Sequence, residues 1–243
     1  MKARGERPIP AEQMLRDLRI NRIFEGSTEI MHLFIAREAV DAHLSVAGDI
    51  IDPEAAFGRK ARAAAKAGGF YAKWLPTLAV GRGQLPSGFN EFGPLAGHLR
   101  YVERAARKMA RETFYGMSRW QGAMERRQAY LGRIVDIGAE LFAMAAACSR
   151  AAMITKQDPK QGAAAYELAD VFCRQARLRV ETLFDGLWSN TDADDRVVAR
   201  KLLDGDYTWL EAGVLDQSEG TGPWISEWSA GASDKPNVHR AYR

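Results

Sequence analysis

Cysteine is scarce in this sequence: only Cys148 and Cys173 occur among its 243 residues, and they form no Cys-x-x-Cys pair. This scarcity excludes a disulfide-rich secreted scaffold and a zinc site built from paired cysteines. Both cysteines lie within apolar segments of helical periodicity. We therefore expect two buried, reduced thiols in a cytoplasmic protein.

Long apolar runs and an excess of one charge are also missing. No window approaches the ~18 consecutive apolar residues that a membrane-spanning helix requires. The start, Met1 to Glu6, has no apolar segment behind its charges, so it does not form a secretory signal. The 34 Lys and Arg residues nearly balance 31 Asp and Glu residues, which leaves a net charge of +3. This balance argues against general nucleic-acid binding, which needs a concentrated basic face.

Strict period-two alternation is absent over any useful length, so no β-sheet is expected. Apolar residues recur at helical spacing instead. They predict helices over residues 11–19, 28–45, 53–80, 95–125, 129–156, 161–188 and 193–204. Pro- and Gly-containing segments separate several of these helices. We predict an all-α fold in which the long helices pack as an antiparallel bundle.

Apolar stripes within the predicted helices indicate which faces are buried. The stripes of the three longest helices are Leu99, Val102, Ala106, Met109, Thr113 and Trp120; Ile134, Ile137, Leu141, Ala145, Cys148 and Ala152; and Leu168, Val171, Gln175, Leu178, Leu183 and Leu187. The helix over residues 28–45 has a stripe formed by Ile30, Leu33, Phe34, Val40 and Leu44. The polar, Gly-rich end of the chain contains Trp224 and Trp228, which predict that it docks on the surface.

One segment, between the first two predicted helices, carries chemistry. Glu25 lies between Phe24 and Gly26, at the end of one helix and just before the next. An aromatic neighbour desolvates a carboxylate and tends to raise its pKa, which suits a general base that works near neutral pH. Gly26 has no Cβ and lets a ligand approach the backbone closely. The following helix start, at Ser27 and Thr28, presents free amides to an anion such as a phosphate. An ordinary capped helix turn is the alternative.

The residues around this turn resemble the C-terminal signature of the acyl-CoA dehydrogenases. Residues 19–30 read Arg-Ile-Asn-Arg-Ile-Phe-Glu-Gly-Ser-Thr-Glu-Ile, and Leu-Phe-Ile-Ala-Arg-Glu follows at residues 33–38. The family's usual form is an aromatic residue, then Glu-Gly-Thr, a short polar pair and Ile. Ser27 replaces the usual threonine and keeps a small hydroxyl. This motif covers about the first 45 residues.

The remainder of the chain, from about Ile50, resembles the extra helical domain of the very-long-chain branch of this family. The likeness rests on length, position and helicity. We therefore expect two domains. Residues 1–48 would be the end of the dehydrogenase C-terminal helical domain, and residues 49–243 would be an appended helical domain with an irregular C-terminal tail.

Carried over residue by residue, the resemblance implies a catalytic site. Glu25 matches the base that removes the α-proton of an acyl-CoA thioester while a hydride leaves the β-carbon for FAD. Gly26 matches a position against the bound thioester, and Arg37 matches one that contacts the CoA moiety in some members. The positions implied to contact FAD are Ser27, Thr28 and Glu29.

The resemblance also implies partners and missing parts. It implies fatty acid β-oxidation, a homodimer, an electron-transfer flavoprotein as one candidate acceptor, and support for attachment to a membrane surface. The family's N-terminal helical domain and middle β-domain, which supply most flavin contacts and the walls of the acyl cavity, have no counterpart in this sequence. Catalysis requires base, substrate and flavin about 3 to 3.5 Å apart. We therefore expect a truncated, split or excised piece that is inactive alone. The alternative is a non-catalytic helical interaction or dimerisation module.

Two further patterns indicate other chemistries. Glu29 and His32 form a Glu-x-x-His pair, but a di-iron bundle site needs two such pairs and two further glutamates, so no metal site is predicted. Residues 57–78 mix basic side chains with aromatics, as in helices that lie on anionic membranes at the inner face. A solvated basic face, packed on the core through its aromatics, is the favoured alternative.

Overall fold

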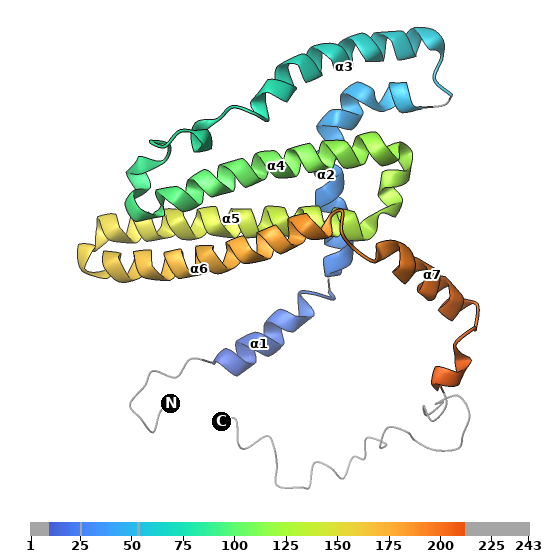
Figure 1. The fold of residues 1–243 in the computed structure, drawn as a ribbon. Helices are drawn as coiled ribbons and strands as arrows, with labels where there is room; N and C mark the ends of the chain where they lie inside the picture. The colour runs from blue at the N-terminus through green and yellow to red at the C-terminus, as the bar shows by residue number, and fades with distance from the viewer. Residues whose placement is uncertain (1–9, 25, 53, 212–243) are drawn as a thin grey trace, which may run out of the picture. The chain divides into compact units, whose positions relative to one another are not determined.

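The computed structural model describes residues 10–24, 26–52 and 54–211. Within these residues the chain forms seven α-helices, several short 3₁₀ segments and no β-strand (Figure 1), so the predicted all-α fold is confirmed. The helices are α1 (Ala11–Ile20), α2 (Thr28–Ile51), α3 (Phe57–Thr77), α4 (Ala96–Trp120), α5 (Gln128–Gln157), α6 (Pro159–Gly186) and α7 (Asp192–Leu203). The C-terminal stretch with Trp224 and Trp228 lies outside the described residues.

Most helix boundaries lie within three residues of the prediction, and the larger differences are the end of α2, at Ile51 instead of residue 45, the start of α3 and the end of α4. Helix α3 begins four residues later than predicted, at Phe57, because the backbone is still extended at Ala56. Helix α4 ends at Trp120, because Gln121 takes a positive φ of 47°. A short 3₁₀ segment, η4 (Gln121–Arg126), then leads into α5.

The hydrophobic core lies between α4, α5 and α6, which run side by side (Figure 1). Asp158 caps α6 by accepting a 2.9 Å hydrogen bond from the Lys160 N–H, and Pro159 opens the helix, so α6 turns back antiparallel to α5. Both cysteines are buried and unbridged, as predicted, with their Sγ atoms 3.7 Å apart. The largest fully buried side chains are Leu95, Ile137, Met144, Leu187, Val180, Cys148 and Cys173.

Helix α5 is long and apolar enough, by length and composition alone, to cross a membrane. It nevertheless packs against α2, α4 and α6. Its buried face contains the predicted residues Ile134, Ile137, Leu141 and Cys148. The central helix of a bundle has the same composition as a membrane span, and α5 occupies that central place.

The stripe predicted for α6 is wrong at Leu168, Val171 and Leu178, which are all exposed. The face that α6 buries consists of Gly162, Ala169, Cys173, Ala176, Val180 and Phe184. Small side chains let two helices approach closely, but they contribute little to an apolar pattern. The larger residues Leu168, Val171 and Leu178 therefore form a second stripe, which faces solvent.

The stripe predicted for α2 has the same error. Ile30, Phe34 and Leu44 are exposed, whereas Ala36 and His43 are buried. Helix α2 packs against α3 on one side and α5 on another. Its large apolar residues therefore point away from both neighbours.

His43 joins α2 to α3 and α4 through aromatic rings. Its Nδ1 lies 3.2 Å from the Tyr71 hydroxyl, and its ring meets Trp74 edge-on with centroids 4.7 Å apart. Phe70 and Phe114 also contact the ring. Burial lowers the pKa of His43. Helix α3 thus packs inward through its aromatics and exposes most of its basic side chains, which is the favoured alternative to a membrane-bound helix.

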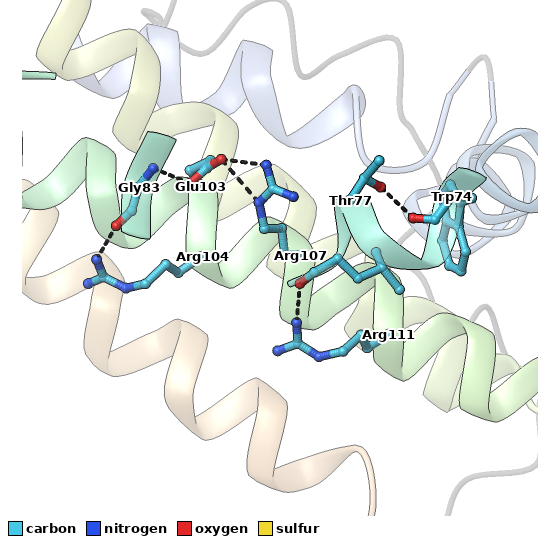
Figure 2. A network of polar contacts seen from close by, with 8 residues as sticks. Trp74, Thr77, Gly83, Glu103, Arg104, Arg107 and Arg111 are labelled. Atoms are coloured by element: carbon cyan, nitrogen blue, oxygen red, sulfur yellow. Dashed lines mark hydrogen bonds and ion pairs between the residues drawn. The ribbon is translucent and has the colours of Figure 1, made fainter. Parts of the chain in front are cut away.

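Arginines of α4 hold the connection between α3 and α4 (Figure 2). Arg111 donates to the Leu78 carbonyl at 2.8 Å, and Arg104 donates to the Gly83 carbonyl at 2.7 Å. The Gly83 N–H donates to the Glu103 carboxylate, which also pairs with Arg107. These contacts hold the loop on α4.

The chain divides into two compact units, residues 1–190 and 191–243. The first contains α1 to α6. In the second, α7 has three acidic residues in its first turn and two basic residues in its last, and it buries none of its side chains. The boundary predicted between residues 48 and 49 rests on resemblance to the family and not on compactness, so it stays a prediction.

Candidate functional site

The predicted catalytic turn joins α1 to α2. Gly26 has a φ of +108°, a left-handed conformation that side chains with a Cβ rarely adopt. A Cβ placed there would lie 3.1 Å from the Met31 Sδ. The Thr28 N–H donates to the Arg22 carbonyl at 3.1 Å and closes the turn. The backbone conformation therefore favours glycine at this position, and a Cβ would also displace the end of the Met31 side chain slightly. Glu25 lies outside the described residues, so its role as the base stays a prediction.

The start of α2 gathers the residues predicted to contact FAD. Ser27 is the N-cap residue, and its carbonyl accepts a 2.9 Å hydrogen bond from the Met31 N–H. A backbone hydrogen bond at Glu29, then one from the Ser27 hydroxyl, hold the pKa of the Glu29 carboxyl below its usual value. Thr28 is the first helical residue. Two hydroxyls and the positive end of a 24-residue helix thus meet at one place, which suits a polar or anionic group.

Among the described residues, many apolar side chains around the turn are exposed. The exposed side chains, which we call the motif face, are Met14, Leu15, Leu18, Ile20, Ile23, Phe24, Ile30, Met31, Phe34 and Ile35. Ile23 is 77% exposed and Phe24 is 63% exposed. So many exposed apolar side chains in one segment are typical of a surface that another surface covers. The desolvation that the sequence predicts for Glu25 therefore requires a covering surface in addition to the Phe24 ring.

Arg37 belongs to the same side of α2 but lies apart from the turn. The spacing of Ile30, Phe34 and Arg37 puts them on one helical face, away from the buried Ala36. Arg37 is exposed and lies roughly 14 Å from Thr28 along the helix axis, by the rise per residue. Arg37 and Ser27 are therefore too far apart to contact the same small ligand group. Only an extended ligand could contact both residues.

The structure brings four of the six predicted site residues together, Gly26 to Glu29, and separates Arg37 from them. Sequence analysis missed the exposure of the motif face, although the signal was present. An apolar stripe on a helix can face either the core or an interface. In α2 the buried Ala36 and His43 show that the other face meets the core, so the apolar stripe is exposed.

Comparisons with known proteins find relatives over nearly the whole chain and a family match over its C-terminal helices. Residues 102–201 match the family described as ACAD9/ACADV, C-terminal domain. The chain is 64% identical over 240 residues to a protein named "Probable acyl-CoA dehydrogenase FadE10" from Mycobacterium bovis, and equally so to proteins of that name from Mycobacterium tuberculosis. These alignments cover 99% of this chain but 37% of each relative. The chain thus spans little more than a third of the length of the curated relatives it matches.

Proposed function

Because the chain belongs to the acyl-CoA dehydrogenase family as a C-terminal portion, we propose that it supplies the catalytic base of an FAD-dependent enzyme. That enzyme would introduce the α,β double bond into fatty acyl-CoA thioesters in fatty acid β-oxidation. One observation carries the proposal: the acyl-CoA dehydrogenase motif lies at a left-handed glycine turn bordered by an exposed apolar face. We also propose that the isolated chain is inactive and binds no flavin by itself.

The residues at the start of α2 fit a flavin cofactor. The hydroxyls of Ser27 and Thr28 lie at the N-terminus of a long helix, where donors and a positive potential favour ribityl or phosphate oxygens. The positive φ of Gly26 lets a planar or acyl group approach the backbone. When bound, FAD supplies a two-electron acceptor for the hydride that leaves the substrate β-carbon.

The chain's own contribution to the reaction is a proton transfer. Glu25 accepts the proton from the α-carbon, and the electrons of that C–H bond form the new α,β double bond as the β-hydrogen leaves with its electron pair. Covering the motif face would exclude water from Glu25 and raise its pKa toward the range of a useful base. The preceding part of the enzyme would supply that cover. Arg37, on the same side of α2, would contact the distal CoA moiety.

The proposal includes further partners. An electron-transfer flavoprotein would accept the electrons, and two copies of the enzyme would form a homodimer. We place the enzyme in the cytoplasm, with a peripheral contact at the inner face of the membrane through the exposed basic side chains of α3.

The test is a substitution at Glu25 in an assembled enzyme. The part of the Mycobacterium tuberculosis relative that this chain does not cover is joined to it, and reduction of an artificial electron acceptor is measured with saturated fatty acyl-CoA thioesters. Glu25→Gln keeps the shape but removes the base, so kcat should fall by about 100-fold to 10,000-fold with flavin still bound. Glu167→Gln, an exposed position on α6, is the matched control and should retain the rate.

A Glu25→Gln enzyme with near-normal turnover would refute the assignment of the base. An assembled enzyme that binds no flavin and oxidises no thioester would favour the second candidate, a helical interaction or dimerisation module. That candidate is supported by the exposed leucine stripe of α6, which resembles a helix-packing surface.

A further inference from the structure

The first turns of α2 touch the bundle at a defined point on α5. The Nε2 atom of His32 lies 3.4 Å from the Asp136 Oδ1 atom. A Cβ placed on Gly132 would lie 3.4 Å from the other ring nitrogen, Nδ1. Gly132 and Asp136 are four residues apart and share one face of α5. The imidazole of His32 therefore lies across α5, with one nitrogen near each of these residues.

This contact lies close to the catalytic motif. His32 is the fifth residue of α2, and the residues predicted to contact FAD, Ser27 to Glu29, precede it by three to five positions. Its side chain is 23% exposed, and that of Asp136 is 47% exposed, so the pair is partly shielded from solvent. Ala36, one turn further along, is 2% exposed and continues the contact of this face with the bundle. The opposite side of the same turns carries the exposed motif face.

We infer that the contact of His32 with Asp136 across Gly132 is a positioning device: the appended bundle sets where the start of α2, and with it the Gly26–Glu29 segment, is held. The catalytic consequence rests on the proposed function, whereas the positioning itself does not. A helix whose inner face is fixed near its N-terminus presents its capping residues at a constant place. Small displacements of such residues cost catalysis heavily, because reacting groups must be held near contact distance.

Hydrogen exchange of the intact 243-residue chain tests the positioning directly. Asp136→Asn removes the carboxylate that faces the His32 ring, and the amides of Met31 to Ile35 should exchange about threefold to tenfold faster, as expected for a partly exposed contact. Asp136→Glu should restore much of the protection. Asp41→Asn, an exposed aspartate on α2 itself, makes the same chemical change away from α5 and should leave these amides unchanged.

Gly132 provides a second, independent variant. An alanine Cβ at 3.4 Å makes ordinary contact with the His32 ring, so Gly132→Ala should keep the protection. Gly132→Leu places a bulky side chain where the ring lies and should raise exchange at the start of α2. Leucine also has a higher helix propensity than glycine, so α5 itself should remain folded and its amides protected. Faster exchange in α2 with unchanged exchange in α5 would show that Gly132→Leu changes how α2 is held. Faster exchange in both helices would show that it destabilises the whole bundle.

Two results would overturn the inference. Unchanged exchange at Met31 to Ile35 in both Asp136→Asn and Gly132→Leu would show that this contact does not hold α2. In the assembled enzyme, Asp136→Asn should lower kcat about threefold to tenfold with little change in KM, and an unchanged kcat beside faster exchange would refute the catalytic role. Failure of the proposed function gives a different result, since the exchange effects would persist in a protein without dehydrogenase activity.

Discussion

In the bundle of α4, α5 and α6, Ile137 and Val180 are 0% exposed, whereas Ile23 in the motif segment (residues 19–30) is 77% exposed. Both regions are rich in large apolar side chains and both are helical or close to helices. The bundle uses these side chains to hold itself together. The motif segment leaves them on the surface, where they gain stability only by contact with another surface. From this comparison we expect the bundle to be stable by itself and the motif segment to be completed by a second surface.

The largest expected effect is a difference between the two regions in how much one substitution lowers the free energy of unfolding. Ile137→Ala removes a fully buried side chain and should lower the free energy of unfolding by about 2–5 kcal/mol. Ile23→Ala makes the same change at an exposed position and should alter it by less than about 0.5 kcal/mol. Urea unfolding followed by circular dichroism measures both. A loss of 2 kcal/mol or more in Ile23→Ala would mean that the motif segment has a core of its own, and the contrast would disappear.

A smaller effect is expected at His43, which links α2 to α3 and α4, and concerns how stability depends on pH. Burial lowers the pKa of His43 in the folded chain, so the unfolded chain binds the proton more tightly. The resulting stability is present above the unfolded pKa of about 6.5 and is lost as pH falls through the lower folded value. The melting temperature of the chain should therefore fall between about pH 7 and pH 5.

His43→Phe keeps an aromatic ring among Tyr71, Trp74 and Phe114 but cannot be protonated. Its melting temperature should fall less steeply over this pH range than that of the original chain. Asp41→Asn, exposed and nearby on α2, serves as the control for a general change in charge. Equal slopes for the original chain and His43→Phe would show that this histidine does not link α2 to the bundle's stability.

Most of the fold could be predicted from the sequence, because its determinants are local. Helical periodicity located the helices, and Asp158 with Pro159 marked the turn between α5 and α6. The buried face of α5 was correct, since large apolar residues such as Ile137 and Leu141 define it. The buried faces predicted for α2 and α6 were partly wrong, because small residues such as Ala36 and Ala176 are buried while larger ones such as Phe34 and Leu178 are exposed. Periodicity finds stripes but does not say which one meets a partner.

The site was predictable where its residues are neighbours in sequence. Gly26 to Glu29 necessarily lie together, and the positive φ at Gly26 agrees with the close approach predicted for it. The His32–Asp136 contact could not be predicted, because its partners are far apart in the sequence and depend on how α2 crosses α5. The desolvation predicted for Glu25 depends on what covers the motif face, and the local sequence pattern does not establish that.

The smallest expected effect is at Arg179 and Glu140, on the outer face of the bundle. The guanidinium donates two hydrogen bonds to the carboxylate, at 2.6 and 2.9 Å, and the two side chains are 45% and 23% exposed. An ion pair so exposed is screened by solvent, so Arg179→Gln should lower the free energy of unfolding by less than about 1 kcal/mol, and by still less at high salt. Urea unfolding at two salt concentrations measures this.

These residues line an open groove together with Asp136 and Leu178, beside the contact that holds α2. If Arg179→Gln instead lowers the free energy of unfolding by 2 kcal/mol or more, independent of salt, the outer face of α5 and α6 is packed as tightly as the core. The exposed α6 stripe would then be part of the bundle that is stable by itself. A small, salt-dependent loss in the free energy of unfolding would mean that the exposed α6 stripe resembles the motif face. The apolar side chains of both would then contribute stability only after a second surface covers them.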